Sequence, residues 1–369
     1  MTSIASVAAP ISAATIHVPG VLWYTRCPVP TPLGIAVQQG HVAAEFARDG
    51  LEVKSLRDDP AKEIRESHYD HKLTNSFRQG GSVPAIWAKS AGRDTRVIGL
   101  TWTDEYQVVV TRPASGIRTP KDLAGRRIGV PRRDGDVVDF PRAMALRGID
   151  NALRLGGLDL TKVQLVDFKR EQGFADSIRS QPTGSGQDAG WNPGDERREQ
   201  PELAALLAGQ VDAIYLKGAR ALGTVEQHGL AVVVDIGNHP DPLIRANNGT
   251  PRPLTVDGHL AENRPDVVRR ILGRVIDAGT WAAAHPEETA AYIAREVGAS
   301  VDLVQRAYGP DLHRHLGTGL DPAHVAGFTD FIAWLHRHGF IPQAIDVSTW
   351  IDSTALNALG IHKNAGKAA

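Results

Sequence analysis

The runs "HVPGVLWYT" at residues 17–25, "PLGIAVQQGHVAAEFARDG" at residues 32–50 and "LEVKSL" at residues 51–56 decide the fold class. The first and third runs have the length and composition of β-strands, whereas the second has apolar residues at helical spacing and ends on a glycine, a common helix terminator. Strand-like and helix-like runs then alternate from about Thr15 to about Ile236. This alternation is typical of a layered α/β fold with mostly parallel strands.

A change of pattern divides the chain into two parts of ordinary domain size. Two β-rich runs at 96–103 and 106–112 lead into a turn-rich segment at 113–120, where we expect the chain to cross from one lobe to the other. From Arg264 onward the sequence consists of amphipathic helices. The expected division is an N-terminal arm at 1–14, a discontinuous first lobe at 15–112 plus 237–369, and a second lobe at 113–236.

The composition excludes several classes of protein. The 41 Lys and Arg residues nearly balance the 42 Asp and Glu residues, so the chain has no basic field of the kind that attracts nucleic acid or anionic lipid. No run of about 18 apolar residues appears, and the Ala-rich N-terminus lacks the charged start and apolar stretch of a secretory signal. The single cysteine cannot form an internal disulfide. We therefore expect a monomer in the reducing cytoplasm, with no nucleic-acid or membrane partner.

The sequence gives no sign of a metal or an organic cofactor. The segment at 180–200 is rich in Gly, Pro and charge, and we expect a loop or flap at 181–200. Its "GSGQDAG" follows no strand and lacks the spacing of a dinucleotide fingerprint. Close His pairs occur, but no nearby Cys or carboxylate set completes a zinc site. Two tryptophans, Trp102 and Trp191, are candidates for lining a ligand cleft.

The only cysteine lies in "YTRCPVPTP", residues 24–32. Cys27 follows the first expected strand and precedes a helix whose start is marked by three prolines. A thiol near a helix N-terminus and close to Arg26 is placed where its anionic form is favoured, which makes it reactive. The alternative is a structural role, because free cysteines are commonly buried as small apolar side chains.

A second candidate motif is "HYDHKLTNSFRQGG", residues 68–81. His68 can act as a base or hold a thiol in place. Arg78 carries a planar fork of donors that suits a two-oxygen anion such as a carboxylate, sulfinate or sulfonate. Gly80 and Gly81 allow backbone N–H groups to approach the same anion closely. Together these residues describe an oxyanion pocket, although each of them alone is more often structural.

The order of the elements resembles that of the two-lobed periplasmic binding proteins for sulfonates and related small molecules. The matching text lies at 31–53, 115–131 and 206–215 and continues into the helical tail, so the resemblance covers nearly the whole chain. It implies an α/β periplasmic-binding-protein type II fold with a helical C-terminal part, a ligand cleft between the lobes, and closure about a hinge. The fold alone does not give the function.

The combination of candidate residues is similar to a narrower family, the 2'-hydroxybiphenyl-2-sulfinate desulfinases of dibenzothiophene desulfurisation. The matching text is "CPVP" with Cys27, then His68, then Arg78 with the Gly pair that follows it, and further on "DLAGRRIGV" and "VDAIY". The resemblance implies hydrolytic cleavage of the carbon–sulfur bond of an aromatic sulfinate, which releases sulfite without a metal or an organic cofactor.

The same resemblance implies roles for the matching residues. Arg78 and the Gly80–Gly81 pair, through the N–H of Gly81, hold the sulfinate oxygens. Cys27 meets the reacting centre, either as a nucleophile or as a proton donor. His68 orients or activates Cys27 in either scheme.

The chain departs from this family at several positions. Thr25 stands where the family has a serine; it keeps the hydroxyl, and we include it among the substrate-binding residues. Residues 70–72, Asp-His-Lys, replace a more aromatic stretch, and the segments 184–199 and 216–222 look unlike the aromatic walls expected for a biphenyl. We therefore expect the chemistry to be kept and leave the arene open.

Two other functions stay open at this point. A non-catalytic binding protein for a sulfonate or related small anion would grip its ligand with Arg78 and the glycine amides and would cleave nothing. A biosynthetic enzyme of the thiamine-pyrimidine type on the same fold would need a cofactor, or histidine and cysteine chemistry that one cysteine does not supply.

Overall fold

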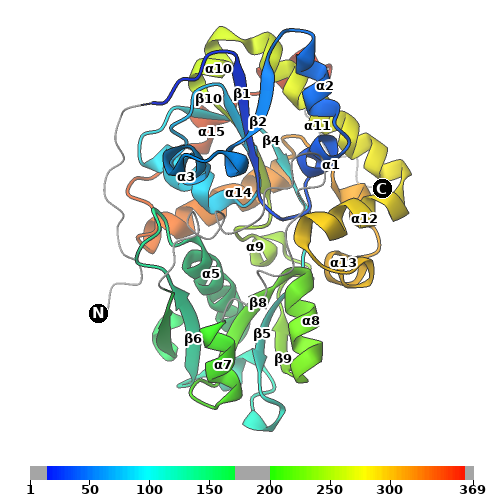
Figure 1. Cartoon of the computed structure of the whole chain (residues 1–369). Coiled ribbons are helices and arrows are strands. Elements are labelled where there is room, and N and C mark those ends of the chain that lie inside the picture. Colours follow the sequence, from blue (N-terminus) through cyan, green and yellow to red (C-terminus); the bar gives the residue numbers. More distant parts are fainter. Residues whose placement is uncertain (1–14, 171–199, 362–369) are drawn as a thin grey trace.

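The chain folds around two five-stranded sheets in the computed structural model, which describes residues 15–170 and 200–361 (Figure 1). The first sheet has the strand order β2-β1-β3-β10-β4 and the second the order β7-β6-β8-β5-β9. The strands are β1 (Val21–Arg26), β2 (Glu52–Ser55), β3 (Ser76–Gln79), β4 (Thr95–Thr101), β5 (Gln107–Thr111), β6 (Arg127–Arg132), β7 (Gln164–Lys169), β8 (Ala213–Lys217), β9 (Ala231–Asp235) and β10 (Arg252–Asp257). The α/β fold class that the alternating runs predict is confirmed.

Both sheets are mixed, and the expectation of mostly parallel strands is confirmed, because four of the five strands in each sheet run in the same direction. β1 pairs in parallel with β2 and β3, and β6 pairs in parallel with β7 and β8. By contrast, β5 and β10 pair antiparallel with both of their neighbours. These are the two strands that follow the crossings between the sheets. A strand that enters a sheet from the other lobe needs no helical crossover on its own lobe, so it can run against its neighbours.

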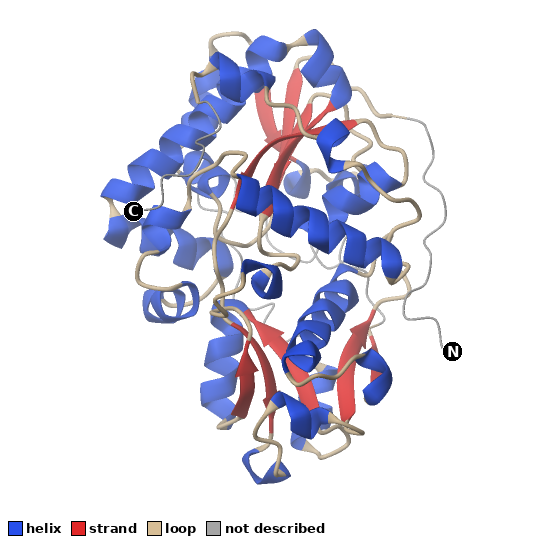
Figure 2. Ribbon diagram, turned by 180° about the vertical axis from the view of Figure 1, so that it is seen from behind, coloured by secondary structure: helices blue, strands red, loops and turns tan. Residues whose placement is uncertain are grey.

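Helices pack around both sheets (Figure 2). They are α1 (Pro32–Gln38), α2 (His41–Ala47), α3 (Lys62–Asp70), α4 (Ser82–Ser90), α5 (Phe140–Leu155), α7 (Pro201–Leu207), α8 (Gly218–His228), α9 (Pro242–Arg245), α10 (Gly258–Asn263), α11 (Pro265–Ala284), α12 (Pro286–Val297), α13 (Val301–Tyr308), α14 (Pro322–Arg337), α15 (Val347–Trp350) and α16 (Thr354–Ala358). Short 3₁₀ segments are η1 (Leu56–Asp58), η2 (Pro113–Ser115), η3 (Pro120–Leu123), η4 (Leu160–Lys162) and η6 (Leu312–His315).

The helical runs of the sequence correspond to these elements with one exception. The run at 32–50, expected as one helix, forms α1 and α2, because Gly40 between them has a left-handed backbone with φ 75°. In the second lobe the longest helix among the described residues is α5, which begins after the side chain of Asp139 caps it. The helical C-terminal part is confirmed as well, since α11 to α14 follow one another after Arg264.

The first crossing between the lobes lies earlier than the sequence pattern indicates. β5 belongs to the second sheet, although the expected first lobe extended to residue 112. The crossing is therefore the segment 102–106, and the chain returns between β9 and β10, at 236–251. The run at 113–120, where the crossing was expected, instead contains the short 3₁₀ turn η2 and ends at the first residue of η3.

Some expectations fall on residues that the structure does not describe. They are the N-terminal arm at 1–14 and the flap at 181–200 with Trp191, of which only Gln200 is described. Within the two described ranges, no helix has the length and apolar character that crossing a bilayer requires.

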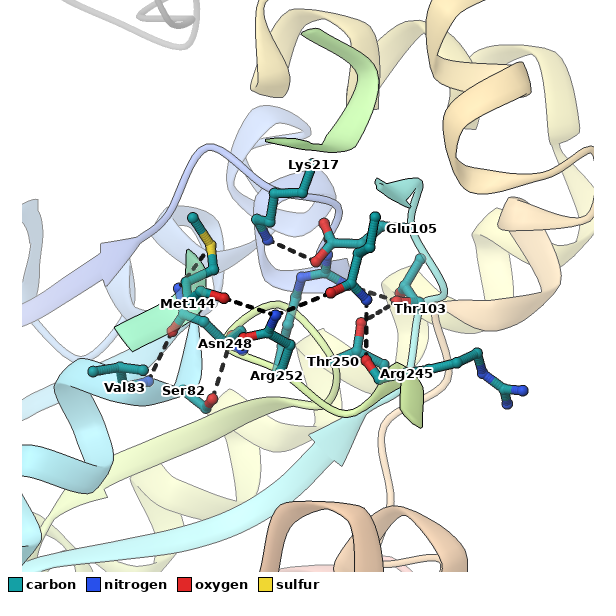
Figure 3. A network of polar contacts seen from close by, with 12 residues as sticks. Ser82, Val83, Thr103, Glu105, Met144, Lys217, Arg245, Asn248, Thr250 and Arg252 are labelled. Atoms are coloured by element: carbon teal, nitrogen blue, oxygen red, sulfur yellow. Dashed lines mark hydrogen bonds and ion pairs between the residues drawn. The ribbon is translucent and has the colours of Figure 1, made fainter. Parts of the chain in front are cut away.

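A buried carboxylate holds the first crossing between the two sheets (Figure 3). Glu105 has Oε1 2.6 Å from Nζ of Lys217, the last residue of β8, and Oε2 3.4 Å from Nη2 of Arg252, the first residue of β10. The carboxylate and the guanidinium are almost completely buried. Because Lys217 belongs to the second sheet and Arg252 to the first, one carboxylate binds a cation from each lobe.

We expect Glu105→Gln to lower the free energy of unfolding by about 3–5 kcal/mol, because the neutral amide leaves two cations in a largely buried site. Urea denaturation measures this change. The matched control is Glu226→Gln, since Glu226 pairs with Arg306 where both side chains are well exposed and an ion pair contributes little. Equal denaturation midpoints for the two variants would contradict the role given to Glu105.

Candidate active site

Cys27 lies at the carboxyl edge of the first sheet, directly after β1. β1 and β3 are parallel neighbours, with Arg26 opposite Gln79. The residues that follow the two strands, Cys27 and Gly80, therefore meet at the same edge. The N–H of Cys27 donates to the carbonyl of Gln79 over 3.3 Å, which fixes this meeting.

Gly80 leaves the space that the thiol occupies. A Cβ atom on residue 80 would lie 2.4 Å from Sγ of Cys27 and 2.8 Å from its Cβ. These separations are far below van der Waals contact, so a larger residue at position 80 would displace the thiol. Gly80 was expected to let an anion approach the backbone, and its missing side chain leaves room for Sγ of Cys27.

A series of polar contacts connects β1 to the thiol through an imidazole. Nδ1 of His68 lies 2.8 Å from Oγ1 of Thr25, and Nε2 lies 3.7 Å from Sγ of Cys27. His68 is near the C-terminal end of α3, more than forty residues from the other two along the chain. The structure thus brings Thr25, His68 and Cys27 together. Thr25 was expected among the substrate-binding residues, and its side chain contacts the histidine.

The imidazole of His68 is neutral at physiological pH. Burial holds the pKa of His68 well below its ordinary value of 6.5, and the charge of Arg78 lowers it further. A neutral imidazole has one donor and one acceptor nitrogen. In one tautomer the thiol of Cys27 donates to Nε2 while Nδ1–H donates to Thr25. In the other, the hydroxyl of Thr25 donates to Nδ1 while Nε2–H donates to a thiolate.

Arg78 is a buried cation with no carboxylate partner among the described residues. It is 1% exposed, and Nη2 donates to Sγ of Cys27 over 3.4 Å. Nε and Nη1 are buried and have no acceptor in the part of the chain that the structure describes. Burial lowers the pKa of Arg78, but a guanidinium keeps its charge in proteins. Because buried donors and charges without partners are costly, an anionic ligand would stabilise this site.

The second predicted anion donor is the N–H of Gly81, the residue before α4. The N–H groups of Ser82 and Val83 donate to the carbonyl and to Oδ1 of Asn248, at 2.7 and 2.8 Å. Within the described ranges, the N–H of Gly81 has no acceptor. The amide that was expected to bind an anion is therefore not already used by the protein.

An aromatic ring beside His68 connects it to the second lobe. Tyr69, the next residue on α3, has its ring edge-on to that of His68, with centroids 4.8 Å apart. The same ring stacks on Phe140 at 6.2 Å, and Phe140 is the first residue of α5 in the second lobe. Tyr69 could have been found from its position next to His68, whereas no local motif marks Phe140.

A buried ion pair of the second lobe lies near the same rings. Arg133 and Asp136 follow β6 and are 3.5 Å apart, with both side chains largely buried. Burial raises the pKa of Tyr69 well above 10, and the charge of Asp136 raises it further. Neither residue is predicted from the sequence, because nothing in the run that contains them indicates a site.

The sequence suggests that a helix N-terminus and Arg26 stabilise the thiolate of Cys27, but in the structure Arg78 takes this place. α1 begins at Pro32, so Cys27 lies in the loop before this helix and not at its N-terminus. Arg26 forms an ion pair with Glu296 on α12. Arg78 is the cation that contacts the sulfur.

Trp102 lies apart from the thiol. It lines a separate cavity of about 330 Å³ with His315 and His324, stacks on the ring of His324 at 5.2 Å, and donates from Nε1 to Asp104. It was expected to line the ligand cleft, but its contacts are with these neighbours.

Over 15–170 and 200–361, no group of three or more His, Cys, Asp or Glu side chains is arranged to hold a metal ion.

Comparison with known proteins supports the motif resemblance over the whole chain. The chain is 27% identical to the 2'-hydroxybiphenyl-2-sulfinate desulfinase of Rhodococcus erythropolis, in an alignment that covers 97% of this chain and 98% of the relative. The chain is thus similar to the 2'-hydroxybiphenyl-2-sulfinate desulfinases over nearly its whole length. The corresponding desulfinase of Rhodococcus qingshengii matches to the same extent.

Solved structures of this desulfinase and of binding proteins have the same fold. The DSZB C27S mutant in complex with biphenyl-2-sulfinic acid superposes with a TM-score of 0.72 at 26% identity, over 93% of this chain and 99% of that one. The periplasmic aliphatic sulphonate binding protein SsuA from Escherichia coli superposes with a TM-score of 0.61 at 17% identity, over 95% and 96%. A family model described as "NMT1/THI5 like" matches residues 31–181. The two-lobed binding-protein fold expected for a desulfinase relative is thereby confirmed.

His71, the residue that follows α3, makes stability depend on pH. Burial and then the charge of Arg78 lower its pKa from 6.5 to about 3. The native state keeps this ring neutral while the unfolded chain takes up a proton, so the contribution is complete above pH 6.5 and is lost as the pH falls toward 3. We expect the wild type to lose up to about 1.4 kcal/mol per pH unit more than His71→Asn below pH 6.5, because the variant lacks this ring.

Urea denaturation at pH 7, 6 and 5 measures the two slopes. His228→Asn is the control, because His228 is exposed at the end of α8 and its replacement should keep the wild-type slope. Equal slopes for the wild type and His71→Asn would contradict the assignment.

Proposed function

We propose that the protein is a desulfinase that hydrolyses the carbon–sulfur bond of an aromatic sulfinate and releases sulfite. One observation carries the proposal: the buried guanidinium of Arg78, with donors on Nε and Nη1 unused, lies against the thiol of Cys27. A site of this kind needs an anion and presents a reactive atom to it. The similarity to the desulfinases over nearly the whole chain supports the same reading.

The proposed ligand fits the donors that the protein leaves open. A sulfinate carries one negative charge on two oxygens, which matches a guanidinium fork better than a point charge. The N–H of Gly81 supplies a further donor without a side chain in the way. The ring of His68 contacts the thiol, and the rings of Tyr69 and Phe140 follow it in succession, which favours an aromatic group on the substrate.

Two routes balance the overall reaction, in which an aryl sulfinate and water give the arene and bisulfite. In the first, His68 takes the thiol proton and the sulfur of Cys27 attacks the sulfinate sulfur. The carbon–sulfur bond breaks, the aryl carbon takes the proton from His68, and water then cleaves the sulfur–sulfur bond to give bisulfite and the thiol.

In the second route, the thiol of Cys27 gives its proton directly to the ring carbon. The carbon–sulfur bond breaks and leaves sulfur dioxide, while Nε2–H of His68 and Arg78 stabilise the thiolate. Water adds to sulfur dioxide to form bisulfite, and the proton released restores the thiol. In both routes Thr25 holds the ring of His68 through Nδ1: its hydroxyl accepts from Nδ1–H in the first route and donates to Nδ1 in the second.

We expect purified protein to release sulfite from biphenyl-2-sulfinate or benzenesulfinate, and Cys27→Ser to lower this rate by about 10²–10⁴-fold, the scale of losing a nucleophile or an acid group. A sulfite assay measures the rate. Cys27→Ser should still bind the sulfinate, which calorimetry checks. Undiminished release by Cys27→Ser removes the mechanism, and tight binding by the wild type without any sulfite indicates a binding protein.

We expect Arg78→Ala to weaken transition-state binding by about 2–4 kcal/mol, because the charged buried partner of the anion is lost. Arg78→Lys should restore little, since an ammonium cannot reproduce the planar fork. The ratio kcat/KM for each variant measures the effect. The control is Arg65→Lys, because the buried Arg65 donates to backbone carbonyls at 59 and 60. Wild-type values for Arg78→Ala would show that the anion binds elsewhere.

A further inference from the structure

Two adjacent asparagines, Asn247 and Asn248, lie on the segment that returns from the second lobe to the first, and Figure 3 shows the contacts of Asn248. Asn247 and Thr250 exchange backbone hydrogen bonds of 2.8 and 3.0 Å, which close a tight turn directly before β10. Both asparagine side chains are buried. Buried amides must be satisfied by neighbours, so their partners show which parts of the molecule this turn connects.

Asn247 binds the second lobe. Its Nδ2 lies 3.1 Å from each of three acceptors: Oε1 of Gln107 on β5, the carbonyl of Met144 on α5, and the hydroxyl of Tyr215 on β8. These partners come from three elements of one lobe. Oδ1 of Asn247 accepts from the N–H of Asn248 over 2.7 Å, which connects the two asparagines directly.

Asn248 binds the first lobe at the start of α4. Its carbonyl accepts from the N–H of Ser82 at 2.7 Å, and its Oδ1 accepts from the N–H of Val83 at 2.8 Å. These are the first two amides of the helix, which otherwise have no intrahelical partner. Nδ2 also lies 3.9 Å from Sδ of Met144, so the same amide touches the second lobe.

The amide of Asn248 also packs directly on Gly81. A Cβ atom on residue 81 would lie 2.8 Å from Nδ2 and 2.9 Å from Oδ1 of Asn248. Because Asn248 occupies the amides of Ser82 and Val83, the N–H of Gly81 is the one at this helix start that stays open to a ligand. The position of Gly81 therefore depends on Asn248.

We propose that Asn248 is a positioning residue for the anion site: it holds the Gly80–Gly81 turn in place and, with Asn247, ties that turn to the second lobe. The inference rests on the proposed function in naming the anion as a sulfinate. Its geometry does not depend on catalysis, since the same turn would hold a sulfonate that is bound and not cleaved. Asn248 touches neither the thiol nor His68 in the described contacts, so it acts through Gly81.

The test begins with Asn248→Ala in the full-length protein. We expect KM for biphenyl-2-sulfinate to rise at least tenfold with a smaller change in kcat, because binding of the anion is what the turn supports. Hydrogen exchange of the peptide at 80–86 should become faster, since the amide of Val83 loses its acceptor. If the wild type binds benzenesulfonate but releases no sulfite from sulfinates, Kd for benzenesulfonate replaces KM.

A double-mutant cycle with Gly81→Ala separates positioning from general destabilisation. In the wild type the added methyl group meets the amide of Asn248, so Gly81→Ala should raise KM by a similar factor. In the Asn248→Ala background that amide is gone, so adding Gly81→Ala should change KM by less than threefold. Additive effects of the two substitutions would contradict the proposal.

Asn151→Ala is the matched control. Asn151 is a fully buried asparagine on α5 whose Nδ2 donates to the carbonyl of Ile244 at 2.8 Å, on the same return segment but away from α4. It should lower the thermal midpoint and leave KM within twofold of wild type. An unchanged KM in Asn248→Ala overturns the proposal even if exchange is faster, because Asn248 would then be a helix cap only. If the wild type shows neither turnover nor binding, the proposed function fails. Separately, unchanged hydrogen exchange at 80–86 in Asn248→Ala would contradict the claim that Asn248 holds this turn in place.

Discussion

A guanidinium buried without a carboxylate is the constraint on which the rest of the site depends. Arg78 lies on β3, between β1 and β10 in the middle of the first sheet, where every neighbour removes it from water. Two of its nitrogens are left without acceptors among the described residues. The protein folds despite this cost because two large sheet cores supply the stability. A local energetic cost of this kind is typical of a functional site, where buried donors are left without protein acceptors so that a ligand can bind them.

Strand register determines which side chains meet at the edge of the first sheet. The parallel pairing of β1 with β3 sets Cys27 beside Gly80, and the absent side chain of Gly80 leaves room for the sulfur. α3 precedes β3 and places His68 at the same edge, where Thr25 is hydrogen-bonded to Nδ1 of its ring. No loop of unusual shape is needed, because ordinary α/β geometry gathers the carboxyl ends of neighbouring strands.

The sequence was sufficient for the kind of fold and for candidate residues that the structure brings together, and insufficient for their contacts. Strand and helix periods identify most elements, and the spacing of Cys27, His68 and Arg78 resembles a known family. Arg26 was assigned beside the thiol because it is adjacent in sequence, yet successive residues of a strand point to opposite faces. Its partner Glu296 is 270 residues away, beyond the reach of any local pattern.

The lobe boundary and the contribution of the second lobe were missed for a related reason. β4 and β5 have the same β-rich composition, and a strand that changes sheets leaves no mark in its own residues. Phe140, Asp136 and the asparagine pair have roles only because the chain crosses between the sheets twice, and hydrophobic periodicity does not report such long-range connections.

The path of the chain has a consequence for how such proteins can diversify. The second sheet is formed entirely by a continuous segment between β4 and β10, whereas the thiol, imidazole and guanidinium all come from the part before it. A gene can therefore accumulate changes in that inserted segment without altering the codons for these three groups. Under the proposed function, mutations that change substrate range through the second lobe are separable from mutations of the groups that break the bond.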